Sequence, residues 1–251
     1  MRRFRMGIAI VLASGLASGC ATATKSGSNP DANNGQRDSN GMQFFDAPNN
    51  QQIDAPMNTG PDAAQAITLS ETQNDTISYG GTVACGSNLT GSTVDNIWYR
   101  AFQLSDYAAI SGGLHITGVN FLVQDAKSSL AITVKVGSYT GALDGASLDT
   151  TKISALAQAN TTPADTSGMT GEMISVPLTA DIAAGGKFVV EVVAPTMDID
   201  SNQHALYIGT TAANETHPGY WSSSGCSQST PETMSAAMAS GHLVIDVVGT
   251  H

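Results

Sequence analysis

Short apolar runs separated by turn residues recur from about Ile67 to His251, and they constrain the fold more than any other feature of the chain. Most runs span about five to ten residues, and many alternate apolar with polar positions, as half-buried β-strands do. Glycine pairs at 112–113 and 185–186 and the Asp-Gly step at 144–145 mark turns. Long helical periodicity is absent, and residues 231–240 predict at most a short helix. The pattern predicts an all-β fold.

About ten such runs in about 185 residues fit a single β-sandwich domain of the jelly-roll-like kind, which we place at residues 66–251. A domain of that length is large enough to bury a core. The runs that we expect to form strands are TISYGGTVA, IWYRAFQL, LHITGVNFLV, LAITVKVGSY, TKISALA, GEMISVPL, KFVVEVVA, HALYIG and HLVIDVVG. The predicted core comprises Trp98, Phe102, Ile116, Val119, Phe121, Ile132, Val134, Val136, Val189, Val190, Val192, Ile208, Val244 and Val247.

Residues 20–65 have a different composition. Pro, Gly, Asn, Ser and Asp dominate this segment, and apolar residues are scarce. Such a segment cannot bury enough surface to offset the entropy lost on ordering. We therefore expect a disordered acidic tether, and a coil of about 45 residues would have an r.m.s. span of about 35–40 Å.

Residues 1–19 have the layout of a secretory signal peptide. Arg2, Arg3 and Arg5 supply a positive start, and residues 8–16 form an apolar stretch that is too short to span a hydrocarbon core of about 30 Å. Small residues follow at 17–19, as a peptidase requires at its cleavage site. We expect this segment to direct export.

The sequence LASGC at 16–20 resembles the lipobox of bacterial lipoproteins. The resemblance implies that the leader is cut before Cys20, that fatty acids such as palmitate are attached there, and that these chains anchor the protein to a membrane. The family usually has Leu where this chain has Ala17. Ala21, rather than Asp, favours the outer membrane or cell surface of a Gram-negative bacterium. The alternative is an ordinary signal peptide that is cut near Ala23.

A lipidated Cys20 would leave Cys85 and Cys226 as a pair of thiols in an exported protein. Two cysteines in an oxidising compartment favour a disulfide, and two free buried thiols are the alternative. A loop of about 141 residues closed by that bond would stabilise the fold by about 5 kcal/mol in the chain-entropy treatment.

Three stretches resemble parts of a β-sandwich module that recurs in exported proteins of environmental bacteria. DNIWYRAFQLSDY at 95–107 resembles its opening segment, YIGTTAANETHPGYWSSSGC at 207–226 its closing segment, and HLVIDVVG at 242–249 its last strand. The resemblance implies a jelly-roll-like sandwich with a Cys85–Cys226 bridge, and it carries over no activity, ligand or catalytic residue.

Arg100 lies on the predicted strand of the opening segment, between Tyr99 and Phe102. A guanidinium at this position can pair with a carboxylate on a neighbouring strand or stack on an aromatic ring. We interpret Arg100 as a structural residue rather than a ligand-binding one.

The charge and motif content exclude several classes of function. Without Arg2, Arg3 and Arg5, seven Lys and Arg would face 21 Asp and Glu, and such an acidic protein does not favour nucleic acid as a partner. The sequence contains no GxSxG, HExxH, P-loop or dinucleotide motif. We expect no enzyme and no catalytic residue, although a Ser-His-Asp triad assembled from distant positions would make a cryptic hydrolase.

Asp198, Asp200 and Asn202 alternate like the first ligands of an EF-hand calcium loop. The pattern then fails, because Gln203 stands at the sixth position and Gly209 at the twelfth. We expect a solvated acidic loop and no cofactor, with one structural calcium as the alternative.

Tyr220 and Trp221 stand in a polar context rich in Gly and Ser. They are the best candidates for an exposed platform on which sugar rings could stack, and the alternative is that they fill the sandwich. The sequence thus favours a non-enzymatic, surface-exposed lipoprotein whose β-sandwich has a binding or structural role, with a glycan or a surface protein as partner. A carbohydrate-binding accessory module is the second hypothesis.

Overall fold

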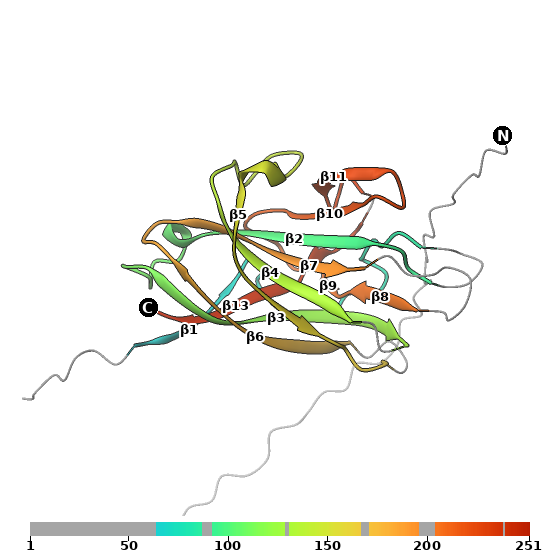
Figure 1. Cartoon of the computed structure of the whole chain (residues 1–251), viewed down its shortest axis with the longest axis horizontal. Coiled ribbons are helices and arrows are strands. Elements are labelled where there is room, and N and C mark those ends of the chain that lie inside the picture. The colour runs from blue at the N-terminus through green and yellow to red at the C-terminus, as the bar shows by residue number, and fades with distance from the viewer. Residues whose placement is uncertain (1–63, 87–91, 129–130, 167–170, 196–203, 238) are drawn as a thin grey trace, which may run out of the picture. The chain divides into compact units, whose positions relative to one another are not determined.

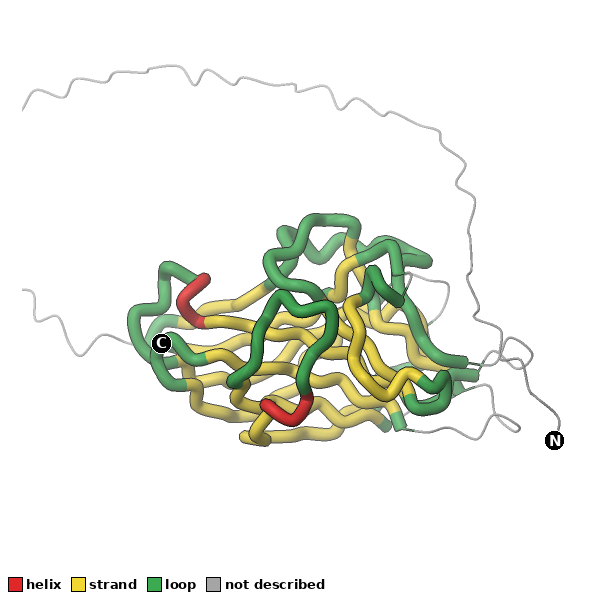
Figure 2. The backbone as a smooth tube through the Cα atoms, turned by 90° about the horizontal axis from the view of Figure 1, so that it is seen from above, coloured by secondary structure: helices red, strands yellow, loops and turns green. Residues whose placement is uncertain are grey.

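The structure of the protein is a computed structural model that describes residues 64–86, 92–128, 131–166, 171–195, 204–237 and 239–251. Over these residues the fold is all-β, as the sequence predicts (Figure 1). Short 3₁₀ helices lie between the strands at Leu104–Asp106 (η1) and Thr150–Lys152 (η2), and Figure 2 draws helices in red. No helix in the described part of the chain is both long and apolar enough to span a membrane.

Two antiparallel sheets pack face to face, and neither closes into a barrel. The five-stranded sheet has the order β1-β13-β3-β6, with β8 also paired to β3; its strands are β1 (Ala66–Ser70), β13 (Ile245–Thr250), β3 (Leu114–Lys127), β6 (Glu172–Ile182) and β8 (Ala205–Ile208). The six-stranded sheet has the order β11 (Gln228–Thr233), β10 (Gly219–Ser223), β2 (Asn96–Gln103), β7 (Lys187–Ala194), β4 (Ile132–Tyr139) and β5 (Ile153–Thr161). A small separate pair joins β9 (Thr210–Thr211) to β12 (His242–Leu243).

The strand order is that of a jelly roll. Strands β1, β3, β6 and β13 lie in one sheet and β2, β4, β5 and β7 in the other, so the chain crosses repeatedly between the layers. Strands β8 to β12 are an insertion before the last strand, and β10 and β11 extend the six-stranded sheet beyond β2. The predicted jelly-roll-like sandwich is therefore confirmed.

The core lies between the two sheets. Every residue of the predicted core is buried, because the strands alternate inward with outward side chains. The rings of Phe102 and Phe188 stack there with centroids 5.0 Å apart. Val189 and Val244 do not belong to this inner cluster, and Val189 packs on the outer side of the six-stranded sheet.

The segment at 231–240, for which the sequence allows a short helix, forms none among its described residues. Its first residues complete β11, and turn residues follow up to Ala237. Thr233 pairs with Tyr220 of β10, so sheet pairing decides the local conformation in place of helix propensity.

Candidate functional site

The outer face of the six-stranded sheet carries the candidate site. Trp98, Arg100 and Phe102 of β2 point into the sandwich, so Ile97 and Tyr99 point outward. The same alternation places outward-facing side chains of β7, β4 and β10 beside them. One half of this face is covered and the other half is open.

Residues 140–149, between β4 and η2, cover one half of the face. Leu143 and Leu148 are buried there in a second apolar cluster, together with Tyr99, Tyr139 and Tyr220 of the sheet. The connection is also tied by hydrogen bonds, since the Tyr220 hydroxyl donates to the carbonyl oxygens of Leu143 and Gly145. In Figure 1 this connection stands above the sheet, close to β10 and β11.

The open half contains a groove. Thr150 of η2, Asp95 and residues around the β10–β11 turn contribute to its lining. The side chains that line the groove are those of Asp95, Ile97, Tyr99, Thr150, Glu191, Ser222, Ser223, Ser224 and Ser229. Most of the lining residues carry a hydroxyl or carboxylate group, and Ile97 is the one aliphatic member of the lining.

The sheet register extends this polar surface from β10 to the edge strand β5. Two rows of outward positions run side by side across the strands. One row is Ser222, Ile97, Val193, Thr133 and Asn160, and the next is Tyr99, Glu191, Lys135 and Gln158. Gln158 and Asn160 are exposed, so both rows end in polar side chains at the edge of the sheet.

Glu191 of β7 lines the groove from the side of the sheet. Its side chain is 17% exposed, and Lys135 Nζ lies 4.0 Å from its Oε2. Burial raises the pKa of Glu191, and the charge of Lys135 partly offsets this. No hydrogen bond joins Glu191 to another side chain or turn within the described residues, so its carboxylate oxygens keep their acceptor capacity for a ligand.

Asp95 organises the rim of the groove. Its carboxylate accepts hydrogen bonds from the Ser224 amide at 2.9 Å, the Ser224 hydroxyl at 2.6 Å and the Gly225 amide at 2.9 Å. Burial works to raise the pKa of Asp95, but these hydrogen bonds outweigh it and the pKa is lowered. The carboxylate therefore stays ionised and holds the turn in place.

The disulfide predicted from the cysteine count is confirmed, and it lies next to this rim. Cys85 is bonded to Cys226, with the two Cα atoms 5.8 Å apart. The side chain of Asn96 joins the chain at Cys85 to strand β10. Its Oδ1 accepts hydrogen bonds from the Cys85 amide at 2.6 Å and from Trp221 Nε1 at 2.9 Å. The groove rim is thus fixed by covalent and hydrogen bonds.

The prediction that Tyr220 and Trp221 form an exposed platform is wrong. Their exposed fractions are 0% and 6%. Trp221 pairs with Trp98 across β10 and β2 and points into the core, while Tyr220 points outward but lies beneath residues 140–149. Burial raises the pKa of the Tyr220 hydroxyl to about 12. Neither ring is available for stacking on a sugar.

A second polar cluster surrounds Arg100, which is fully buried. Its Nη1 donates to Glu215 Oε2 at 2.7 Å and to the His217 carbonyl oxygen at 2.8 Å, and its Nη2 donates to the Leu243 carbonyl oxygen. Glu215 also pairs with His242, at 2.7 Å. These contacts are internal, and they agree with the structural role predicted for Arg100.

His217 continues this cluster toward the surface. Its ring lies between two carboxylates, with Nδ1 2.6 Å from Asp144 and Nε2 2.9 Å from Asp106. Burial works to lower the pKa of His217, but the hydrogen bonds to Asp144 and Asp106 outweigh it and the pKa is raised. Both ring nitrogens are occupied, so His217 has no nitrogen left to act as a base.

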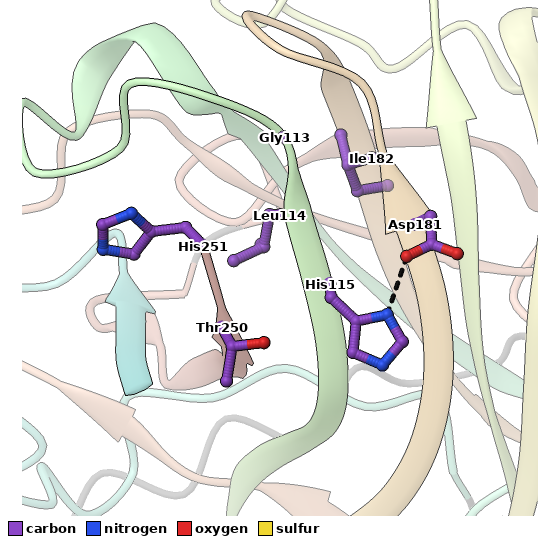
Figure 3. A pocket seen from close by; sticks show the side chains of 7 residues that line it. All are labelled: Gly113, Leu114, His115, Asp181, Ile182, Thr250 and His251. Atoms are coloured by element: carbon purple, nitrogen blue, oxygen red, sulfur yellow. Dashed lines mark hydrogen bonds and ion pairs between the residues drawn. The ribbon is translucent and has the colours of Figure 1, made fainter. Parts of the chain in front are cut away.

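A shallow depression on the five-stranded sheet contains another histidine–carboxylate pair (Figure 3). His115 Nδ1 lies 2.7 Å from Asp181 Oδ1, and both side chains are well exposed. Thr250 of β13 lies opposite His115 of β3 in the sheet. Among the described residues, however, no hydrogen bond joins any histidine to a serine, threonine or cysteine side chain, which a hydrolase triad would need.

Several predicted sites lie outside the described residues. The lipid-attachment residue Cys20 and the calcium candidates Asp198, Asp200 and Asn202 belong to this group. Within the described ranges, no three His, Cys, Asp or Glu side chains are grouped so that they could hold a metal ion.

Glu191 was not among the predicted site residues, although the sequence around it carries a signal. KFVVEVVA places one carboxylate among four valines, out of phase with the inward positions of Val190 and Val192. An isolated charge on the outer side of an apolar strand marks a position where the sheet faces water or a ligand.

Comparison with known proteins gives little further guidance. No family model matches the chain, and no curated protein matches it. One solved structure with some similarity contains the cysteine protease and lectin-like domains of Cwp84, a surface layer associated protein of Clostridium difficile. The TM-score is 0.42 and the identity 13%, and the match covers 63% of this chain and 32% of that one. A similarity at this level assigns no function.

Proposed function

We propose that this protein is an exported, lipid-anchored binding protein without catalytic activity, and that it holds a carbohydrate in the groove on the outer face of the six-stranded sheet. Export is supported by the leader at 1–19 and by the Cys85–Cys226 disulfide, which is typical of oxidising compartments. The lipid anchor at Cys20 rests on the lipobox-like sequence LASGC, and Ala21 favours the outer membrane or cell surface of a Gram-negative bacterium. Residues 20–65 would be the tether.

The observation that carries the binding role is the composition of the groove. Its lining contains four serines, one threonine and two carboxylates, and its aromatic residue, Tyr99, is only 4% exposed. Ser222 and Ser223 are buried, so Ser224, Ser229, Thr150 and Glu191 are the polar groups that a ligand can reach. Protein–protein interfaces depend on large apolar or aromatic anchors at their centre, and this groove presents none. A sugar chain presents many hydroxyl groups that can both donate and accept, which suits such a lining.

The anchor is tested by Cys20→Ser. The variant is expected to leave the membrane fraction, while the matched variant Ser26→Ala, also in the tether, stays with it. Sedimentation after carbonate extraction and labelling with a fatty-acid analogue measure the two properties. A Cys20→Ser protein that still sediments with membranes and resists carbonate would contradict the lipid anchor.

The binding role is tested with the full-length protein in detergent, incubated with a panel of insoluble polysaccharides and recovered by sedimentation. We expect retention on at least one polysaccharide and loss of retention in Glu191→Ala. Asp181→Asn, on the outer face of the other sheet, is the control and should be retained as well as the unmodified protein. Failure to bind any polysaccharide would overturn the carbohydrate assignment but not the anchor.

A further inference from the structure

The charges of the groove are unbalanced. None of the side chains that line it is basic, whereas Asp95 and Glu191 are both acidic. Lys135 lies on the same row as Glu191, but its side chain is 41% exposed and its Nζ lies 4.0 Å from Glu191 Oε2. The full chain is also acidic, with a formal net charge of −11. A ligand in the groove therefore meets a negative potential at short range and from the molecule as a whole.

The two carboxylates have different roles. Asp95 is occupied by the Ser224 and Gly225 groups of the rim turn, so it contributes charge but little free acceptor capacity. Glu191 has no such partners in the described part of the chain and lines the groove from the side of the sheet. A carboxylate in this state can accept hydrogen bonds from two adjacent hydroxyl groups at once, because each oxygen has its own lone pairs.

We propose, building on the carbohydrate-binding function above, that the groove selects an uncharged glycan whose neighbouring hydroxyls donate to Glu191, and that it excludes glycans that carry carboxylates or sulfates. Hydroxyl donors satisfy the acceptor capacity of Glu191, whereas an anionic sugar would place a second negative charge in a partly desolvated site. Screening by salt is weak in such a site, so the exclusion persists at physiological ionic strength.

The geometry also gives the direction of the glycan. The two rows run across the strands, which lie about 4.8 Å apart, so each strand offers one side chain per step along the ligand. One row passes from Ser222 of β10 to Asn160 of β5, and the neighbouring row passes from Tyr99 of β2 over Glu191 to Gln158 of β5. Because β5 is an edge strand with exposed polar side chains, a chain of several sugars can continue over the edge. The groove is thus suited to an oligosaccharide rather than to a single sugar.

The test compares neutral with acidic polysaccharides on the full-length protein in detergent. The neutral probes are a β-1,3-glucan, a β-1,4-mannan and amylose, and the acidic probes are polygalacturonate and alginate. We expect measurable affinity by calorimetry for at least one neutral probe, little change of this affinity between low and high salt, and no heat with either acidic probe. Glu191→Gln keeps the side-chain shape and should weaken neutral binding about tenfold, because a hydrogen bond to a charged group is lost.

Two variants make the result specific. Asp181→Asn removes one negative charge from the opposite sheet, and it should change the binding of neither the neutral nor the acidic polysaccharides. Gln158→Ala should weaken binding of a hexasaccharide but not of a disaccharide of the same sugar, since Gln158 lies at the edge of the row. Thermal unfolding of each variant separates loss of binding from loss of the fold.

The experiment distinguishes failure of the proposed selectivity from failure of the proposed carbohydrate binding. Equal or tighter binding of the polyuronates, or unchanged neutral binding in Glu191→Gln, would overturn the proposed selectivity and leave carbohydrate binding standing. An absence of binding to every neutral and acidic probe would overturn the carbohydrate-binding function itself, and the selectivity with it.

Discussion

Arg100 and Glu215 form a salt bridge inside the protein, with Nη1 2.7 Å from Oε2 and the arginine side chain fully buried. The two residues come from distant parts of the chain, one from β2 and the other from the segment before β10. The same guanidinium donates hydrogen bonds to the carbonyl oxygens of His217 and Leu243. One buried cation thus connects the six-stranded sheet to the insertion that precedes the last strand.

Removal of this cation should destabilise the fold strongly. Arg100→Met keeps an apolar side chain of similar length but leaves Glu215 and two carbonyl oxygens without their donor. Loss of one partner of a buried pair costs about 3–5 kcal/mol, and we expect a decrease of that size in the free energy of unfolding in urea. Lys135→Met, which removes a partly exposed cation, is the control and should cost less than about 1 kcal/mol. Equal effects of the two substitutions would contradict the role of Arg100.

His217 should make stability depend on pH. Its pKa in the folded protein is raised above the ordinary value of 6.5, because its hydrogen bonds to Asp144 and Asp106, and the charge of Glu71, outweigh burial. The stabilisation is therefore fully present below about pH 6.5 and is lost as the pH rises through the folded pKa. Urea unfolding between pH 6 and 9 should show a decline that disappears in His217→Gln. The variant His115→Gln, which alters an exposed pair, should keep the decline.

Asp246 should oppose folding at neutral pH. Burial raises its pKa from 3.8 to about 6, and its Oδ1 has no hydrogen-bond partner among the residues that the structure describes. Its contribution to stability is fully present below pH 3.8 and is lost as the pH rises through about 6. Asp246→Asn should therefore stabilise the protein at pH 7, by up to about 3 kcal/mol, and have little effect at pH 4. A destabilised variant at pH 7 would show that the carboxylate has a favourable role.

The disulfide should contribute a large share of the stability. Its closed loop has a sequence separation of 141, and the chain-entropy treatment gives about 4–5 kcal/mol for a loop of that order. Unfolding with and without reductant, and of the double variant Cys85→Ser/Cys226→Ser, measures the contribution. Intact mass should rise by two hydrogens on reduction. Because Cys226 adjoins the turn held by Asp95, reduction of the disulfide should also lower the affinity of the groove for its ligand.

The sequence predicts the fold well because alternation and burial are local properties of each strand. The positions of Trp98 and Phe102 in the core follow from their phase on β2. The same reasoning fails for Tyr220, whose phase on β10 is indeed outward. Its burial depends on residues 140–149, which are distant in sequence, and no local pattern announces that they fold over this face. Glu191 illustrates the opposite case, because its own position on the strand is plain from the sequence but the residues beside it are not. Its neighbours across the sheet and in the groove come from distant parts of the chain, so only the folded structure shows them.

The link between Cys85 and Cys226 also has a mechanical consequence. Tension applied at the N-terminal side of the domain would reach the groove rim through covalent bonds alone, after some twenty residues and one sulfur–sulfur bond. The polypeptide between the two cysteines, which includes most strands of both layers, cannot be drawn out while that bond is intact. The groove rim would therefore stay covalently linked to the N-terminal side of the domain even under a pull that separates the outermost strands.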